Sequence, residues 1–347
     1  MNHEKKILYT PQYNINKSKT DTIKISKTFN NKDSIQKRNY YTIQNLLYNK
    51  WNDIIINFEE YKINNKKELK KLTRLGIPDN LRGFIWQKFS GIDKSNLKNK
   101  YNEFKENNKN LPNKNEEDII KDLFRTSHST FFKNKFGLGQ INLYNVLSTF
   151  SNQSETGYVQ GMSFLCASFL SYMNEESAFW MMKNLMEKYN MKGYFQNNFP
   201  ELKRSYYKLL KLLKSIFPKI YFVLKKWKIF PDYYARQWFL TLFFLDVNYD
   251  VFLRILDIFL LEKNFKIIYR ISLALLKLNE EKIFNAENFS DLMIIFKDIG
   301  KDLTVNQLFT EGFKIKIHIN TLEKYGLEYD DLKEKGINDE IMEQLIN

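Results

Sequence analysis

The stretch GYVQGM at residues 157–162, with the apolar run that follows it, is the part of the sequence that decides the fold. From Met162 the chain reads MSFLCASFLSYM, in which Met162, Leu165 and Phe169 recur at helical spacing and further apolar residues fill most of the remaining surface. A helix that is apolar nearly all round is usually buried, so this segment predicts a central helix. The two glycines predict a tight turn before it, because glycine accepts backbone angles that other residues avoid.

Gln160 lies in this turn, at the mouth of the predicted buried helix. A rigid helix is a good mount for a side chain that must be held in place, so Gln160 is a candidate functional residue. The alternative is that Gln160 only caps or braces the turn.

The composition favours a helical protein with a sizeable core, since the chain has 347 residues but only 12 Gly and 6 Pro. A single Cys, Cys166, excludes an intrachain disulfide and a Cys-based zinc site, and 3 His leave little for a metal. The N-terminus lacks the apolar run of a signal peptide, and no stretch approaches the ~18 apolar residues of a membrane span. We therefore expect an intracellular protein without a transmembrane segment.

The net charge of +14 is concentrated near the N-terminus, where residues 1–75 hold 16 Lys and Arg against 7 Asp and Glu. Residues 1–45 are rich in Asn, Lys, Ser and Thr and show no apolar periodicity, which predicts a disordered, basic, low-complexity tail. Such a tail is a candidate for peripheral contact with a membrane, and a plain solvated tail is the alternative. No nucleic-acid partner is expected, because no zinc finger, RNA-recognition signature or phosphate-binding Gly loop is present.

Residues 46–347 predict one all-α domain, with periodic apolar patterns and no convincing strand or repeat. Pro78 or Asp79 can open a helix in which Ile85, Trp86 and Phe89 face inward. The polar residues 96–117 are expected to form a surface insertion.

A helix is also predicted over residues 116–125, with Asn115 as a candidate cap. Four apolar residues are expected on its buried side: Ile119, Ile120, Leu123 and Phe124. Asp122 and Arg125 are three apart and can meet on one face. This pair is either a weak surface salt bridge or a carboxylate that orients a working guanidinium.

Three separated segments resemble the signature motifs of TBC domains, the GTPase-activating domains for Rab GTPases. They are RLGIP at 74–78 with the following LR and W of residues 81–86, IIKDLFRT at 119–126, and YVQGM at 158–162. The resemblance covers roughly residues 72–278 and implies a single two-lobed helical domain, with 279–347 as its helical C-terminal part.

The resemblance implies that the chain is not an enzyme by itself but activates a GTP-bound Rab GTPase in trans. Arg125 would serve as an arginine finger and Gln160 as a glutamine finger that orients the attacking water. The supporting residues implied are Asp122, Thr126, Tyr158 and Gly161, and those of the structural motif are Gly76, Pro78, Arg82 and Trp86. No cofactor of its own is implied, because GTP and Mg²⁺ are carried by the partner. The implied setting is vesicle traffic in the cytoplasm, peripheral to endomembranes.

Some positions depart from the family pattern, including Lys263-Asn264, where a Gly is frequent, and Ser127-His128 after the second motif. These departures affect loops rather than the two fingers. The alternative function is a catalytically silent TBC-fold module that binds a GTPase or an adaptor as a scaffold. A third alternative is a basic protein that meets membranes or nucleic acid through residues 1–75.

Overall fold

The structure is a computed structural model that describes residues 46–92, 99–108, 111–126, 130–134 and 137–339. The chain divides into residues 1–47 and a unit of residues 48–347, and every helix named below belongs to the second unit. The predicted tail at residues 1–45 lies outside the described residues, as does the loop departure at residues 127–128.

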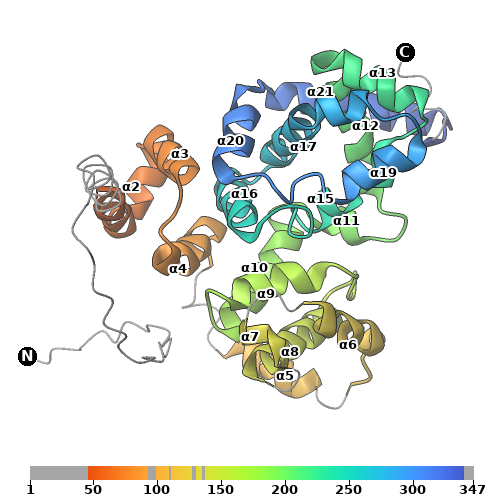
Figure 1. The fold of residues 1–347 in the computed structure, drawn as a ribbon. Helices are drawn as coiled ribbons and strands as arrows, with labels where there is room; N and C mark the ends of the chain where they lie inside the picture. The colour runs from red at the N-terminus through yellow and green to blue at the C-terminus, as the bar shows by residue number, and fades with distance from the viewer. Residues whose placement is uncertain (1–45, 93–98, 109–110, 127–129, 135–136, 340–347) are drawn as a thin grey trace, which may run out of the picture. The chain divides into compact units, whose positions relative to one another are not determined.

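The described residues confirm the all-α prediction (Figure 1). They contain no strand, only an isolated bridge between Val247 and Gly300. None of the helices in this part of the chain combines the length and the apolar character needed to cross a bilayer. After a helical stretch at residues 48–56, the helices are α2 (Phe58–Ile63), α3 (Lys66–Leu75), α4 (Asp79–Ser90), α5 (Lys100–Asn108), α6 (Glu116–Arg125), α7 (Thr130–Lys133), α8 (Leu138–Gln153), α9 (Met162–Leu170), α10 (Glu175–Glu187), α11 (Lys192–Phe195), α12 (Pro200–Ile216), α13 (Pro218–Lys226), α14 (Pro231–Tyr234), α15 (Arg236–Leu240), α16 (Tyr249–Glu262), α17 (Lys266–Leu278), α18 (Glu280–Phe284), α19 (Phe289–Lys297), α20 (Val305–Lys314) and α21 (Ile319–Glu334).

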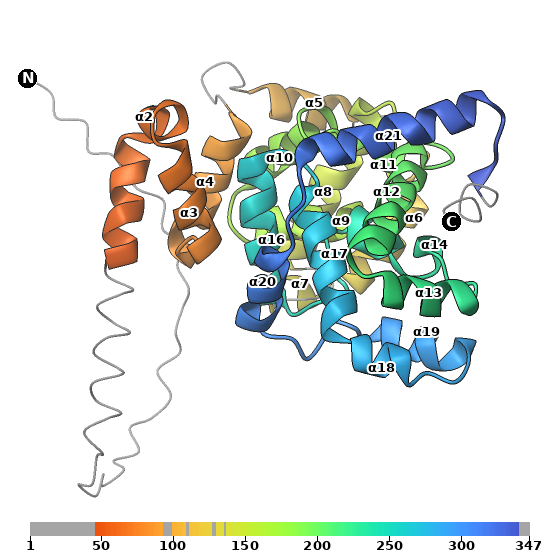
Figure 2. The ribbon, with the colours of Figure 1, turned by 90° about the horizontal axis from the view of Figure 1, so that it is seen from above.

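The helices form two groups, as expected for a two-lobed domain. In the first group α8 packs against α5, α6, α7, α9 and α10, and in the second α17 packs against α12, α16 and α20. Figure 1 shows the first group at the bottom of the view and the second at the top. Figure 2 shows α21 running beside α12, the helix on which it packs. Helices α3 and α4 pack on α16.

Helix α9 confirms the central buried helix that the apolar run predicts. All nine of its residues are buried, including the serines. Its serines can be buried because each hydroxyl finds a partner: Ser168 donates to the Phe164 carbonyl at 2.7 Å, and the Ser163 hydroxyl lies 3.0 Å from that of Thr126. Burial also raises the pKa of the Cys166 thiol, since the charged thiolate is disfavoured away from water. The helix is thus a rigid support for the turn that precedes it.

The first motif forms the junction of α3, α4 and α16. Helix α4 begins at Asp79 after Pro78, as predicted. The Gly76 carbonyl accepts a hydrogen bond from the Trp51 indole at 2.9 Å, which ties the turn before Pro78 to the preceding helical stretch. The buried residues of this motif therefore anchor helices, whereas Leu75 remains exposed.

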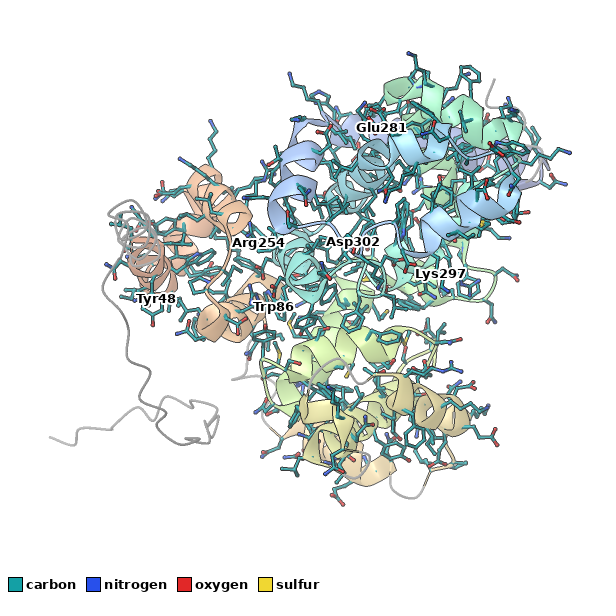
Figure 3. The ribbon with its side chains drawn as sticks, viewed as in Figure 1. Tyr48, Trp86, Arg254, Glu281, Lys297 and Asp302 are labelled. Carbon is teal, nitrogen blue, oxygen red and sulfur yellow. The ribbon has the colours of Figure 1, made fainter. Side chains whose placement is uncertain are left out.

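Arg82 and Trp86 of α4 meet one buried carboxylate, that of Asp257 on α16. Arg82 Nε lies 3.1 Å from Asp257 Oδ1, and the Trp86 indole donates to the same oxygen at 2.7 Å. Burial disfavours the charge on Arg82, but Asp257 and Asp79 outweigh it and raise the pKa of the guanidinium. Trp86 is fully buried, and Figure 3 labels it on α4 together with Arg254 on α16.

Within the predicted surface insertion at residues 96–117, residues 100–108 form the helix α5, which lies at the surface except that it buries Tyr101. Tyr101 of this helix is 2% exposed and stacks obliquely on Phe179, with ring centroids 5.2 Å apart. The Tyr101 hydroxyl and Lys105 both bind the Glu175 carboxylate at 2.8 Å. Helix α5 is otherwise polar, and it packs on α8 and α10 through the two aromatic side chains Tyr101 and Phe104.

A buried carboxylate near α16 makes the stability of the fold depend on pH. Asp246 Oδ2 is buried and accepts no hydrogen bond from a described residue. Burial raises the pKa of Asp246 to about 6, although Lys301 acts in the opposite direction. An Asp in an unfolded chain titrates near 3.8, so the folded protein holds this proton more tightly than the unfolded chain.

We expect the free energy of unfolding to fall by about 3 kcal/mol on account of Asp246 as the pH rises from about 3 to about 7. The contribution is complete below the unfolded pKa and is lost as the pH passes through the folded pKa. Asp246→Asn should remove this part of the pH dependence, as measured by urea denaturation at a series of pH values. Identical slopes for the two proteins would contradict the assignment.

Candidate functional site

The second motif forms α6, whose last residue is Arg125. Asp122 and Arg125 lie three residues apart, and Arg125 Nη1 is 3.4 Å from Asp122 Oδ1. The two partners differ in environment, because the Asp122 side chain is 3% exposed and that of Arg125 is 60% exposed. The pair therefore joins a buried carboxylate to one terminal nitrogen of an exposed guanidinium, and is not a salt bridge between two solvated side chains.

Asp122 also holds the third motif. Its Oδ2 accepts a hydrogen bond from the Tyr158 hydroxyl at 2.6 Å and a longer one from the Gly161 backbone N–H at 3.4 Å. Tyr158 is 4% exposed, and burial followed by the bond to Asp122 raises the pKa of its hydroxyl, so it remains a donor. One carboxylate therefore joins Arg125 to both residues that flank Val159 and Gln160.

The turn before α9 has the glycine geometry that the sequence predicts. Gly157 has φ +64° and Gly161 has φ +104°, both in the region that favours glycine. A β-carbon on Gly157 would lie 2.7 Å from Asn115 Oδ1, so a side chain there would displace the Asn115 amide. Between the two glycines, Gln160 is exposed, and no described residue hydrogen-bonds its amide. The alternative in which Gln160 braces the turn is thus wrong for its side chain.

Asn115 has a role different from the one predicted. Its side chain makes no cap hydrogen bond to α6. Instead, Asn115 Oδ1 accepts from the Tyr158 backbone N–H at 3.1 Å and from the Ser151 hydroxyl at 2.9 Å. Asn115 therefore belongs to the site, because its side chain stabilises the turn before α9. The sequence analysis missed this role because the local pattern around Asn115 predicted a helix cap instead.

Thr126 ends α6 and links it to α9. It is fully buried, and its hydroxyl lies 2.7 Å from the Asp122 carbonyl and 3.0 Å from the Ser163 hydroxyl. Ser163 is the second residue of α9, so the bond connects the end of the helix that carries Arg125 with the start of the helix that follows Gln160. The sequence analysis missed Ser163, which no motif distinguishes from its apolar neighbours.

The apolar face of α6 is narrower than predicted. Ile119 and Leu123 are buried, but Ile120 is 40% exposed and Phe124 is 51% exposed. The buried side is set by α8, where Gln140 donates to the Leu123 carbonyl at 3.0 Å and to the Phe132 carbonyl at 2.6 Å. Ile120 and Phe124 therefore leave apolar surface beside Arg125.

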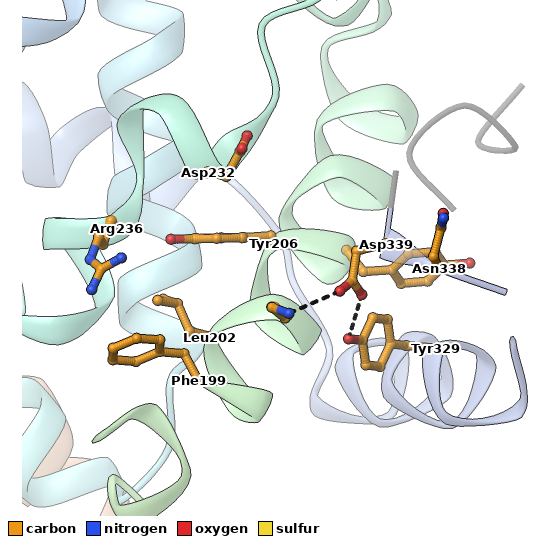
Figure 4. Close-up of a pocket in the computed structure, with 10 residues that line it drawn as sticks. Phe199, Leu202, Tyr206, Asp232, Arg236, Tyr329, Asn338 and Asp339 are labelled. Atoms are coloured by element: carbon orange, nitrogen blue, oxygen red, sulfur yellow. Dashed lines mark hydrogen bonds and ion pairs between the residues drawn. The ribbon is translucent and has the colours of Figure 1, made fainter. Parts of the chain in front are cut away.

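A pocket lies away from the three motifs, between α12, α14, α15 and the end of α21 (Figure 4). It has a volume of about 580 Å³, and none of the residues of the three motifs lines it. Asp339 at its edge accepts from the Tyr329 hydroxyl at 2.8 Å and pairs with Lys203 at 3.2 Å. Among the described residues, no group of three or more His, Cys, Asp or Glu side chains could hold a metal ion. The motif residues instead expose an Arg and a Gln at an open surface.

Comparison with known proteins identifies the family of this chain. Residues 79–284 match the RabGAP-TBC family, described as the Rab-GTPase-TBC domain. The human ecotropic viral integration site 5 protein homolog is 28% identical over 84% of this chain and 36% of its own length. The Rab GTPase-activating protein tbc-11 of Caenorhabditis elegans is 31% identical over 82% of this chain and 31% of its own length. The chain thus spans about a third of the length of these curated relatives.

Solved structures show the same fold. The TBC domain of a Chlamydomonas flagellar RabGAP superposes with a TM-score of 0.65 at 22% identity, covering 78% of this chain and 94% of that domain. The Ypt/Rab-GAP domain of Gyp1p gives a TM-score of 0.62 at 17% identity, covering 82% of this chain and 98% of that domain. Because the family match spans more than half of the chain and includes the helices that bring the second and third motifs together, the chain belongs to the RabGAP-TBC family.

Proposed function

We propose that this chain is a GTPase-activating protein for a Rab-family small GTPase, and that it supplies Arg125 and Gln160 in trans. The observation that carries the proposal is the shared carboxylate of Asp122, which is hydrogen-bonded to Arg125 on one side and to Tyr158 and Gly161 on the other. Two exposed polar side chains anchored through one buried group are suited to act together on a single bound substrate.

The guanidinium of Arg125 suits charge stabilisation during phosphoryl transfer. Charge builds up on the γ-phosphoryl oxygens and the bridging oxygen, and a planar guanidinium offers several donors that match phosphate oxygens. Arg125 is the last residue of α6, and its side chain is 60% exposed, so the guanidinium is accessible to a bound partner. Asp122 restrains the guanidinium and reduces the conformational freedom that would otherwise be lost on reaching the transition state.

The carboxamide of Gln160 suits the attacking water. A neutral amide accepts a hydrogen bond from water through its oxygen and donates to a phosphate oxygen through its nitrogen at the same time. Its exposure and its fixed backbone allow it to replace the glutamine by which such GTPases orient water. In this mechanism GTP and Mg²⁺ arrive with the GTPase, and the activator acts in the cytoplasm at endomembranes during vesicle traffic.

The direct test is a screen of GTP hydrolysis against a panel of GTP-loaded Rab GTPases with the full chain. Stimulation of at least one member, dependent on Arg125, would support the proposal. A panel in which GTPases bind but none is stimulated would replace it with the silent scaffold module.

Gln160→Ala should lower stimulated hydrolysis by about 10²-fold, the usual effect of removing one aligned polar group from a transition state. The matched control is Gln153→Ala, which removes another exposed amide from the last residue of α8. Gln153→Ala should leave the rate unchanged. Combining Gln160→Ala with Arg125→Ala should cost less than the product of the two effects, because both groups serve one transition state.

A Rab GTPase whose own catalytic glutamine is changed to alanine separates the glutamine finger from the arginine finger. If Gln160 orients the water, the wild-type chain should still stimulate this GTPase, whereas Gln160→Ala should not. Loss of stimulation by the wild-type chain, with binding intact, would refute the role of Gln160 and leave an arginine-only mechanism.

A further inference from the structure

A long segment of the second helix group carries only positive charge. Residues 202–231 contain nine Lys and Arg and no Asp or Glu. Those on α12 are largely neutralised by α21 and the residues after it, since Arg204 pairs with Asp330 at 2.6 Å and Lys211 with Glu328 at 2.7 Å. The remaining positive charge lies at the end of α12 and along α13.

Helix α13 has a buried apolar inner face and an outer face that combines lysines with an exposed aromatic ring. Its inner face is formed by Ile220, Tyr221 and Leu224, which are at most 2% exposed. Its outer face carries residues at positions 0, +3 and +7 of one helical stripe: Lys219, Phe222 and Lys226. Phe222 is 59% exposed, so a large aromatic ring lies in water between two exposed lysines.

The end of α13 extends this surface, which we call the α13 face and define as Lys219, Phe222, Lys226, Trp227 and Lys228. Trp227 is half-buried, and Lys226 Nζ lies 4.9 Å from the centroid of its ring. Lys228 is exposed.

The lysines of the α13 face have no acidic partner in the part of the chain that the structure describes. The neighbouring helix α18 contributes Glu280 and Glu281. Glu280 is already paired with Lys277 at 2.5 Å, and Glu281, labelled in Figure 3, is exposed. The α13 face therefore has unbalanced positive charge around an exposed aromatic ring.

We propose that the α13 face docks on a membrane surface rich in anionic phospholipid. Clustered lysines are attracted to anionic headgroups, and an aromatic ring among them can insert at the boundary between headgroups and acyl chains. Lys219, Phe222 and Lys226 lie along one stripe of a surface helix, the arrangement of a helix that lies on a membrane, whereas duplex nucleic acid, which is bound through its phosphates, would use the lysines and not the ring. This contact goes beyond the proposed function and is separate from the one predicted for the tail.

The α13 face is distinct from the residues proposed to act on GTP. Helix α13 packs mainly on α12 and α18, and Figure 1 shows it at the other end of the view from α6. Changes on the α13 face should therefore leave GTPase activation in solution unchanged, while membrane binding is altered.

The test uses the full chain and vesicles of phosphatidylcholine, with or without phosphatidylserine at about a third of the lipid. The wild-type chain should sediment with the anionic vesicles, and the binding should weaken as salt is added. The double variant Lys219→Glu with Lys226→Glu should bind at least about tenfold more weakly. Phe222→Ser should also weaken binding, although it changes no charge. A matched control, Lys67→Glu with Lys71→Glu on the exposed side of α3, makes the same change in net charge and should bind like the wild type.

Tryptophan fluorescence gives a second measurement at the same site. Of the five Trp, Trp51, Trp86, Trp180 and Trp238 are buried and Trp227 alone is partly exposed. Brominated lipids should therefore quench Trp227, and Trp227→Phe should remove the quenching.

Three results would overturn the proposal. In the first, the double variant on α13 binds anionic vesicles as the wild type does, which would assign any membrane contact to the tail. In the second, the chain binds duplex DNA through these lysines but does not bind vesicles. In the third, Phe222→Ser and brominated lipids have no effect, which would remove the contact of the ring on which the choice of a membrane over other anionic partners rests.

Discussion

Arg125→Ala is expected to lower the stimulated rate of GTP hydrolysis by about 10³-fold or more, the range that an arginine supplied in trans contributes in the Ras system. The Arg125 side chain is 60% exposed, whereas that of its partner Asp122 is 3% exposed. Alanine at position 125 therefore removes an exposed guanidinium without creating a cavity in the core. Single-turnover hydrolysis by a responsive Rab GTPase, followed with and without the activator, measures the effect.

Binding measurements distinguish catalysis from recognition in this variant. Affinity for the GTP-bound GTPase should change little, whereas affinity for a transition-state analogue, GDP with aluminium fluoride, should fall strongly. Arg125→Lys should rescue poorly, because an ammonium retains the charge but lacks the planar fork. Lys121→Ala removes a similarly exposed cation from the same helix and should be silent. If the Arg125→Ala variant stimulated GTP hydrolysis as strongly as the wild type does, the catalytic cation would have to be another residue.

Trp86→Ala is expected to lower the free energy of unfolding by about 3–5 kcal/mol, the usual cost of truncating a buried Trp. The ring is fully buried and meets Phe169 edge-on at 5.9 Å and Tyr172 at 5.1 Å between centroids. Its indole also donates to the buried Asp257 carboxylate at 2.7 Å, which would lose a donor. This loss is comparable with the entire stability of many domains.

Chemical denaturation followed by circular dichroism measures the loss. Trp227→Ala truncates the same side chain at a half-buried position and should cost far less. Trp86→Phe retains an aromatic ring but removes the N–H donor together with part of the indole, so its loss of stability should be smaller than that of Trp86→Ala. An unchanged denaturation midpoint for Trp86→Ala would mean that α4 does not anchor α16 and α9 as described.

The elements predicted well are those whose signals are local. An apolar run with no polar side fixes α9 as buried, two glycines fix the turn before it, and Asp122 and Arg125 at i, i+3 must share a face of any helix. The resemblance to the TBC family then supplied the order of the motifs and the residues to examine in them.

The features that were missed depend on contacts between distant segments. Tyr101 is buried only because Phe179, far along the chain, lies opposite it. Asn115 has a capping position but bonds to the Tyr158 backbone instead, a choice that local patterns cannot reveal. The apolar stripe of α6 is so wide that either Ile119 and Leu123 or Ile120 and Phe124 could face the core. The position of α8 decides that Phe124 remains exposed.

The complete burial of α9 has a consequence for the motion of the site. Amide hydrogens in a helix with no solvent-facing residue exchange with water only when a large part of the fold opens, so residues 162–170 should be among the slowest to exchange deuterium. Gln160 stands two residues before this slow segment. Turnover should therefore not wait for the glutamine to become ordered, and any slow conformational step should belong to the GTPase or to release of the complex.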